Sequence, residues 1–419
     1  PEEGDASRGV ISSVTIDETS QYYEERSSGS LSGLGPPPKV SAIFTADDEG
    51  ESQEKPQELK EALVATATME EATVLAAFLK QYNISVKRRS RYPHLGVVVS
   101  VLRIPEELEA AVIIQQLREN NSSLWIDFNH RYQLLGSTSS NRSLPDFKPD
   151  PKLWAYDKVG LSQINTCKPS VKSPPIKIGV IDTGIAPQAP INQSLIIRQP
   201  FLPNGTKVAK TDHGTAIGSL LLGSASHSIP GLVPTALLYS AAIFRSRNKE
   251  TIDTTSELII KALNWLAGEE ITTINMSLGG PRNLLVELVL NRLIKNGFTI
   301  VSAAGVDKNN NPLYPAAQKG VIAVRAIDAN NKVFTEKIQG DYIDFAAPGV
   351  DLWLLNAKGK AKYQSGSSFA APFVTASMSF LNKNESSYKQ LKKTAKDLGV
   401  KGKDRFFGWG LTQAVSNCL

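Results

Sequence analysis

Apolar and polar positions divide the chain into four parts. Residues 1–58 lack periodic apolar spacing and are rich in Ser, Gly, Glu and Asp, as in SSGSLSGLGPPPK. Such a segment cannot bury a core, so we predict a disordered leader. A second polar stretch, residues 139–152, predicts an exposed linker that carries a processing site. In residues 59–138 and 153–419, apolar residues recur with the periods of strands and helices.

Residues 59–138 predict a small α+β domain. LVATAT and ISVKRR alternate like strands, and LGVVVSVLRI is a buried apolar run. MEEATVLAAFLKQY is predicted as a helix with Val74, Ala77 and Phe78 toward one side. A second predicted helix, PEELEAAVIIQQLREN, begins with Pro105 and acidic residues, and SLWIDFNHRYQLL ends the unit as another strand. The order β-α-β-β-α-β is that of the ferredoxin-like fold.

Residues 153–419 predict a doubly wound α/β domain. The strand candidates IKIGVI, ALLYSAAI, TTINMS, FTIVSAA and VIAVRAI are nearly continuous apolar runs, as in a parallel sheet covered on both faces. Helices such as SELIIKALNWLAG and LLVELVLNRLIKNG fall between them, the second with Gly297 as its cap. In this architecture, ligands bind beyond the carboxyl ends of the strands.

Composition and charge narrow the classes of function. The formal net charge of +5, from 46 Lys+Arg and 41 Asp+Glu, does not favour nucleic acid as a partner. The lysines near the C-terminus predict a solvated helix face: Lys389, Lys392, Lys393, Lys396, Lys401 and Lys403. No apolar run reaches the roughly 18 residues of a membrane helix. Cys167 and Cys418 fit either one disulfide or two free thiols, and two cysteines cannot form a zinc site by themselves.

Three segments place reactive side chains at strand ends or helix starts. Asp182 directly follows a buried strand in IGVIDTGIAP, which by itself is also typical of a turn. His213, in TDHGTAIGSLLLG, precedes two small residues that can open a helix. Ser368 enters an apolar helix in SGSSFAAPFVTASMSFL, where a lone serine is typical of an N-cap. Together they supply a carboxylate, a base and a nucleophile.

These residue types fit acyl transfer. A serine hydroxyl is a weak nucleophile until an imidazole takes its proton, and the imidazole needs a carboxylate to fix its tautomer and stabilise its charged form. A serine at a helix start also lies beside free backbone N–H groups, which favour an oxyanion. The order Asp, His, Ser along the chain is that of subtilisin.

Residues 153–416 resemble the catalytic domain of the subtilases, bacterial type. GVIDTGI, DHGTAIGSLL and GSSFAAP resemble the family's Asp, His and Ser motifs, with Ser367 and Phe369 in place of Thr and Met. INMSLGGP, YPAAQKGVIAV and DFAAPGV resemble further landmarks in the family's order. The unit at residues 59–138 similarly resembles the inhibitory, fold-assisting propeptide of these enzymes.

The resemblance implies roles for individual residues. Asp182 would orient His213, which would act as base and then acid, and Ser368 would attack the peptide carbonyl. Two segments would bind substrate, one as a paired strand and one as a wall of the primary specificity pocket; plain sheet core is the alternative for both. The residues are Ser277, Leu278 and Gly279, and Ala303, Ala304 and Gly305. Calcium often stabilises subtilases, but the polar residues 307–311 are also typical of a solvated loop, so we expect no metal and no cofactor.

One residue departs from the family pattern. The family's Ala-Ala-Gly-Asn places an Asn amide at the oxyanion, and this chain has Val306 there. Loss of that donor costs on the order of 10²–10³ in turnover in subtilisin itself, the worked case for this effect. The Ser368 N–H, the Ser367 hydroxyl and Asn309, Asn310 or Asn311 remain as candidate donors. The expected activity is therefore slow, or specialised toward self-cleavage.

We therefore expect the precursor of a serine endopeptidase that acts on peptides or proteins and removes its own propeptide, which also inhibits it. The expected location is outside the cell or in the periplasm or cell envelope, although no signal peptide is visible in the chain. Two alternatives remain. One is a pseudoprotease that binds peptides with little turnover, which Val306 favours and the complete triad opposes. The other is an adaptor that presents the leader and N-terminal unit to a partner.

Overall fold

The computed structural model describes residues 34, 36–37, 61–121, 123–136, 138–139, 150–161, 175–248, 251–381 and 387–413. These residues fall into two compact units. Of the described residues, those up to Arg91 and those of Gly96–Phe128 form the first unit, and those of Tyr92–Leu95 and from Asn129 onward form the second. The predicted leader, most of the predicted linker and both cysteines lie outside the described residues.

The first unit has the predicted order of elements, β-α-β-β-α-β. Its antiparallel sheet has the order β2-β3-β1-β4, and apolar side chains from both helices and from the sheet form its core. The elements are β1 (Glu61–Thr66), α2 (Met69–Leu79), β2 (Ser85–Tyr92), β3 (Val97–Arg103), α3 (Ala110–Asn120) and β4 (Trp125–Phe128), with a short 3₁₀ turn at Lys80–Tyr82.

Two details of the helices differ from the expectation. The buried face of α2 consists of Ala72, Leu75 and Leu79, whereas Val74 and Ala77 are exposed. Helix α3 begins at Ala110 rather than at Pro105, because residues 105–108 close a separate turn in which Leu108 N donates to Pro105 O at 3.3 Å. Proline and acidic residues suit the first turn of a helix, but they suit an isolated turn equally well.

The last predicted strand of this unit is two strands. β4 ends at Phe128 in the first unit, and β5 (Arg131–Leu134) pairs within the second unit. Asn129 and His130 between them are fixed by α6 of the second unit: Asn129 Oδ1 accepts from Glu257 N, and His130 O accepts from Ser256 N. Only Asn129 and His130 separate the two strands, which is why the sequence pattern alone predicts one strand.

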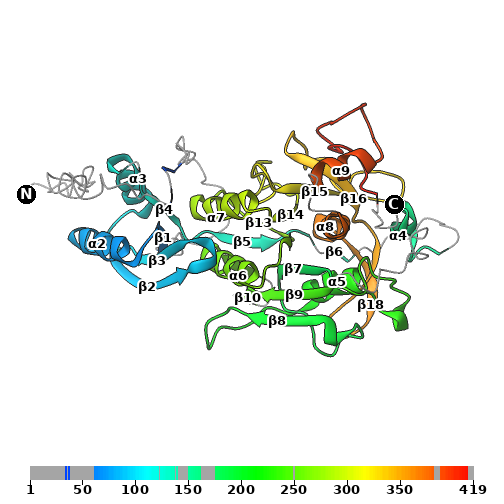
Figure 1. The fold of residues 1–419 in the computed structure, drawn as a ribbon, viewed down its shortest axis with the longest axis horizontal. Helices are drawn as coiled ribbons and strands as arrows, with labels where there is room; N and C mark the ends of the chain where they lie inside the picture. Colours follow the sequence, from blue (N-terminus) through cyan, green and yellow to red (C-terminus); the bar gives the residue numbers. More distant parts are fainter. Residues whose placement is uncertain are drawn as a thin grey trace, which may run out of the picture. The chain divides into compact units, whose positions relative to one another are not determined.

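The second unit is built on the predicted doubly wound parallel sheet (Figure 1). Seven strands have the order β16-β15-β14-β12-β7-β9-β8, and each strand is parallel to its neighbours. They are β7 (Lys177–Asp182), β8 (Ile196–Pro200), β9 (Leu237–Ala242), β12 (Thr273–Met276), β14 (Thr299–Ala303), β15 (Ile322–Ile327) and β16 (Ile343–Pro348). Five of these were expected, and β8 and β16 are additional.

Helices flank this sheet, and capping residues in the sequence set the boundaries of α7. Helices α5 and α8 pack against each other, as do α6 and α7, and α8 crosses the central strands. Helix α7 begins where Asn283 accepts from the N–H groups of Leu285 and Val286, and ends before Gly297, which has φ 84° as expected of a capping glycine. The helices are α4 (Trp154–Lys158), α5 (Asp212–Leu222), α6 (Ser256–Gly268), α7 (Leu284–Lys295), α8 (Ser367–Phe380) and α9 (Ser387–Thr394).

Two small sheets complete the second unit. One has the order β10-β11-β5-β13 and the other the order β17-β18-β6. Both include a strand from the segment that links the two units, β5 or β6. The strands are β6 (Thr138–Ser139), β10 (Arg245–Ser246), β11 (Ile252–Thr255), β13 (Leu278–Gly279), β17 (Leu352–Leu355) and β18 (Ala361–Ser365).

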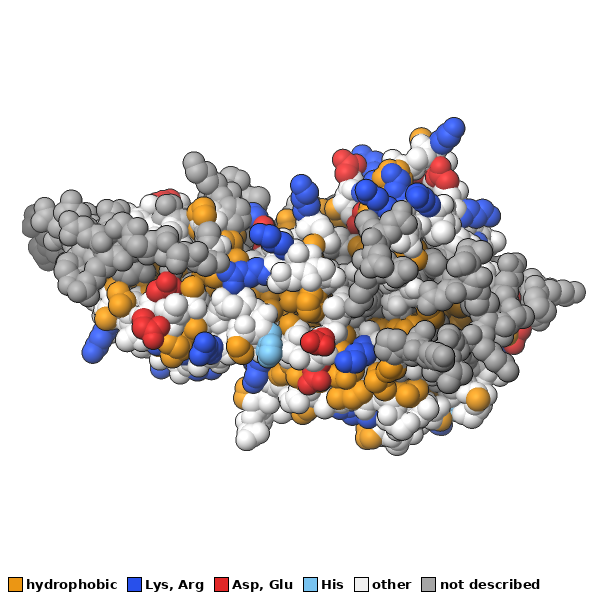
Figure 2. Space-filling view, viewed as in Figure 1, with side chains coloured by type: hydrophobic (Ala, Val, Ile, Leu, Met, Phe, Trp, Pro, Cys, Tyr) orange, Lys and Arg blue, Asp and Glu red, His pale blue; other side chains and the backbone are white. Residues whose placement is uncertain are grey.

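The C-terminal lysines are exposed, as expected, but only half of them lie on a helix. Lys389, Lys392 and Lys393 belong to α9, and the other three follow it in residues 395–403. Figure 2 shows basic side chains gathered over this region. Lys392 Nζ lies 3.4 Å from the centre of the Trp409 ring, so even an exposed lysine here has a structural contact.

Candidate active site

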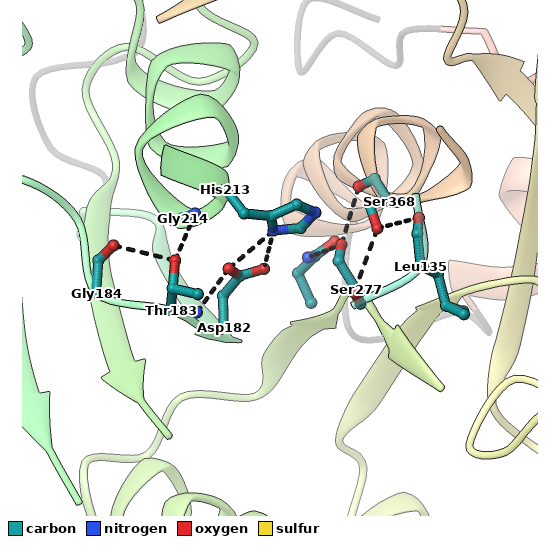
Figure 3. A network of polar contacts seen from close by, with 9 residues as sticks. Leu135, Asp182, Thr183, Gly184, His213, Gly214, Ser277 and Ser368 are labelled. Atoms are coloured by element: carbon teal, nitrogen blue, oxygen red, sulfur yellow. Dashed lines mark hydrogen bonds and ion pairs between the residues drawn. The ribbon is translucent and has the colours of Figure 1, made fainter. Parts of the chain in front are cut away.

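The end of β7 and the start of α5 bring together an acid and a base (Figure 3). Asp182 is the last residue of β7, and His213 is the second residue of α5. His213 Nδ1 lies 2.9 and 2.8 Å from the two carboxylate oxygens of Asp182, and both side chains are buried. A carboxylate in this position keeps the proton on Nδ1 and leaves Nε2 as the basic nitrogen.

Thr183 and Gly214 hold this pair in place, a role that was not predicted from the sequence. Thr183 N donates to Asp182 Oδ1 at 2.6 Å, and Gly214 N donates to Thr183 Oγ1 at 2.8 Å. A Cβ on Gly214 would lie 2.5 Å from Thr183 O, so only glycine lets α5 approach the end of β7 this closely. The Asp-Thr-Gly and His-Gly-Thr strings contain both residues, so the signal was present.

Ser368 lies across the site, as the second residue of α8. Its Oγ donates to the carbonyl oxygen of Leu135 at 2.5 Å, and its N–H donates to the same oxygen at 3.2 Å. His213 Nε2 has no hydrogen-bond partner among the described residues, and Figure 3 shows the ring directed toward Ser368. Ser368 therefore binds the Leu135 carbonyl on one side, and the pair of His213 and Asp182 lies on its other side.

A buried polar network attaches the start of α8 to the central strand β12. Ser277 Oγ donates to Ser368 O, Asn275 Nδ2 donates to Ser277 Oγ, and Thr375 Oγ1 donates to Asn275 Oδ1, each at 2.9 Å. All of these side chains are buried. Because the network is fully paired, it fixes the nucleophile's backbone against the sheet. Asn275 and Thr375 were not expected, since nothing in the sequence links positions 100 residues apart.

Residues 131–135 occupy the site as an extended strand. β5 pairs antiparallel with β13, with Leu134 opposite Leu278 and Gln133 opposite Gly279, and it pairs with β11 on its other edge. This is binding by strand addition, the mode expected for Ser277, Leu278 and Gly279. The Arg131 guanidinium is paired with the buried carboxylate of Asp253.

The side chains of this strand fill two pockets lined by glycines. A Cβ on either Gly279 or Gly305 would lie 2.9 Å from Leu135 Cδ1, so these two glycines form walls around the leucine. Tyr132 is fully buried against Gly280, and its hydroxyl donates to Pro281 O at 3.1 Å. Ala303 belongs to the main core against which Leu135 packs.

Tyr342 supports the wall that contains Gly305. Its hydroxyl donates to Gly305 O at 3.3 Å, and burial raises the pKa of Tyr342 to about 12. The phenol is therefore protonated and able to donate across the physiological pH range. Ala304, which precedes Gly305, packs with Ile338 and Ile343.

The residues considered as oxyanion donors differ in burial and in hydrogen bonding. Val306 packs beside the small apolar cluster of Ala304, Ile338 and Ile343. Residues 309–311 are exposed, and Asn311 Nδ2 donates to Asp307 Oδ2 at 3.0 Å, which keeps both groups within their own loop. Ser367 is 4% exposed, and its Oγ has no hydrogen-bond partner among the described residues. Burial of a hydroxyl without a hydrogen-bond partner costs folding free energy. The unpaired Ser367 hydroxyl is therefore available to bind a group that enters the site.

Two features of the described part of the chain bear on membrane insertion and on metal binding. None of its helices is both long and apolar enough to cross a membrane. Within the same residues, no three His, Cys, Asp or Glu side chains gather in an arrangement that could hold a metal ion.

Known proteins resemble this chain in sequence and in fold. The model of the subtilase family matches residues 174–410, more than half of the chain. The minor extracellular protease Epr of Bacillus subtilis (strain 168) is 25% identical over 315 residues, which cover 72% of this chain but only 47% of that protein. Subtilisin E of the same organism is 27% identical over 272 residues, which cover 58% of this chain and 69% of the relative.

Two solved structures share the fold. Fervidolysin from Fervidobacterium pennivorans, a keratinolytic enzyme, superposes with a TM-score of 0.68 at 20% identity, covering 85% of this chain and 60% of that one. The epidermin leader peptide processing serine protease of Staphylococcus aureus superposes with a TM-score of 0.62 at 16% identity, covering 84% and 96%. At these identities the likeness supports the fold alone.

Proposed function

The chain belongs to the subtilase family, and on this basis we propose that it is the precursor of a serine endopeptidase that cuts itself between Leu135 and Gly136. One observation carries the proposal: both donors of Ser368 bind the Leu135 carbonyl beside the buried pair of Asp182 and His213. The bond lies at the end of the propeptide-like region, three residues before the linker in which processing was expected.

In the proposed reaction, Ser368 is the nucleophile, and His213 first accepts a proton and then returns it. Ser368 Oγ, which lies beside the carbonyl oxygen of Leu135, forms a bond to the carbonyl carbon. As it does so, it gives its proton to His213 Nε2. The C–N bond to Gly136 then breaks as His213 returns the proton to the leaving nitrogen. Water hydrolyses the ester on Ser368 by the same relay in reverse, which frees a carboxylate at Leu135.

The protein stabilises the negative charge with few donors. The Ser368 N–H already binds the Leu135 oxygen at 3.2 Å. We propose that the Ser367 hydroxyl, buried and unpaired, supplies the second donor as the carbon becomes tetrahedral and its oxygen moves. Val306 contributes no donor, so this hydroxyl takes the place of the amide usual in the family.

Ser367→Ala is expected to lower kcat by roughly ten- to a hundredfold with little change in KM, because the lost bond is strongest in the transition state. Ser367→Thr keeps the hydroxyl and should retain most of the activity. Steady-state kinetics on one peptide substrate, with all proteins active-site titrated, measure the difference. An alanine variant with the wild-type kcat would remove Ser367 from the oxyanion site.

The same contacts make the propeptide an inhibitor of the processed enzyme. After cleavage, residues 131–135 would still fill the cleft as a product strand, with Tyr132 and Leu135 in their pockets. We therefore propose intramolecular inhibition until this segment leaves. The substrates would be other peptides or proteins that add a strand to β13 in the same way.

A fragment of residues 59–135 is expected to inhibit the processed enzyme at micromolar concentration. A matched fragment of residues 59–128 keeps β4 but lacks the strand that lies in the cleft, so it should not inhibit. Titration of each fragment against peptidase activity makes the comparison. Equal inhibition by both, or inhibition by neither, would contradict the assigned role of residues 131–135.

The experiment that tests the proposed function is labelling with a fluorophosphonate probe. The processed enzyme should be modified on Ser368, identified by mass spectrometry of the labelled peptide, and should hydrolyse a peptide containing residues 131–139. A folded, processed protein without label or hydrolysis would favour the peptide-binding alternative. We further propose an extracellular or envelope location, supported by the relative that is named an extracellular protease.

A further inference from the structure

The residue that follows the reactive carbonyl has an unusual backbone. Gly136 has φ +91°, in the left-handed region that L-residues rarely adopt. It is held from both sides: Ser368 binds the carbonyl of Leu135 before it, and β6 pairs with β18 after it, with Thr138 opposite Ser365. The backbone around Gly136 therefore has little freedom to turn to a more common conformation.

The space around Gly136 is limited by main-chain atoms. A Cβ on this residue would lie 3.1 Å from Gly366 Cα, and a Cβ on Gly366 would lie 3.0 Å from Gly136 O. The two glycines thus face each other backbone to backbone, with no side chain that could move aside.

Gly366 itself cannot withdraw. Its N–H donates to Gly349 O at 2.7 Å, and a Cβ on Gly349 would lie 2.9 Å from Gly366 O. Gly366 is also the N-cap of α8, so any shift would move Ser367 and Ser368 with it. The contact that limits Gly136 is therefore coupled to the nucleophile's own position.

From these contacts we infer that the site on the leaving-group side of the cut strongly prefers glycine, so that the enzyme selects bonds of the leucine–glycine type. The inference rests on the proposed peptidase function and adds to it a substrate class. Gly366 is the specificity-determining residue, through its main chain. The same restriction selects the bond after Leu135 over the neighbouring bond between Leu134 and Leu135, because only the former places glycine opposite Gly366.

The test uses processed enzyme and three internally quenched peptides that span residues 131–139. They differ only at the position of Gly136, which is Gly, L-Ala or D-Ala. The L-Ala peptide is expected to be cut with a kcat/KM roughly 10- to 100-fold lower than that of the Gly peptide, because it must adopt positive φ against Gly366. D-Ala favours positive φ and places its methyl away from the Cβ position that meets Gly366, so the D-Ala peptide should be cut faster than the L-Ala peptide. Equal slowing of the two peptides would contradict the assignment.

A decrease of less than threefold for L-Ala would overturn the inference while leaving the peptidase function intact. No cleavage of the Gly peptide by a processed preparation, a parallel sample of which the probe labels on Ser368, would overturn the inference as well. No cleavage by a preparation that the probe does not label would overturn the proposed function. In the full chain, Gly136→Ala should slow self-processing at this bond to the same extent, measured as the rate at which precursor disappears. Processing of that variant at the wild-type rate and position would contradict the assignment.

Discussion

Ser368→Ala is expected to leave the chain uncut between Leu135 and Gly136. The substitution removes the oxygen that forms the acyl-enzyme, and in subtilisin itself the loss of the nucleophile lowers turnover by about 10⁶. The wild-type chain should convert to a fragment whose N-terminal sequence begins at Gly136. The variant should remain a single species of full length over the same time.

The control for this prediction is an exposed serine of the same unit. Ser226→Ala changes a hydroxyl that contacts only its neighbours in a surface 3₁₀ turn, so processing should be as fast as in the wild type. Processed wild-type enzyme added to the Ser368→Ala chain distinguishes two explanations of an uncut product. If the added enzyme cuts at Gly136, the bond in the variant can be cleaved, and what the variant lacks is its own nucleophile. Unaided processing of the variant would mean that another protease does the cutting.

Much of the fold was predictable because its signals are local. The strands of a sheet covered on both faces are continuous apolar runs, and helices α6 and α7 carry their boundaries in sequence, at Asn283 and Gly297 for α7. The triad candidates were also local, since each is embedded in a string of glycine and small residues. The structure explains why the motifs contain these small residues. Thr183 and Gly214 allow the close contact of β7 and α5, which places Asp182 beside His213.

The features that were missed depend on tertiary contacts. The buried face of α2 is decided by the sheet it covers, so Ala72 is inside and Val74, though larger and more apolar, is outside. Periodicity could not locate the break after Phe128, because the residues that follow are ordered by β11 and β13 from far along the chain. Nor does a strand sequence reveal that Arg325 is buried and donates to the carbonyls of Phe406 and Thr335.

The position of the proposed cut also depends on tertiary contacts. A polar linker predicts where a chain can be cut, because exposed backbone is accessible to any protease. Self-processing depends instead on which carbonyl the folded site holds. That choice follows from the register of β5 on β13 and from glycines at 279, 305 and 366, none of which lies near Leu135 in sequence. The proposed cut therefore precedes the most polar part of the linker.

Asp182→Asn tests the arrangement of acid and base with almost no change in shape. The carboxylate accepts from the Nδ1–H of His213 through both oxygens, and Oδ1 also accepts from Thr183 N at 2.6 Å. If the Asn oxygen keeps the bond to Thr183, its NH₂ group faces His213 Nδ1. That nitrogen must then become the acceptor, and the proton moves to Nε2.

The altered tautomer is the reason to expect a large effect. With a proton on Nε2, His213 cannot accept the proton of Ser368, so kcat should fall by about 10⁴, as when the equivalent substitution is made in a serine protease of another fold. Single-turnover processing of the precursor and steady-state hydrolysis by enzyme processed in trans both measure it. Asp341→Asn, at an exposed position of the same unit, matches the change in charge and should leave kcat unaltered. A folded Asp182→Asn enzyme within tenfold of wild type would show that the buried carboxylate does not set the state of His213, and the proposed mechanism would lose its general base.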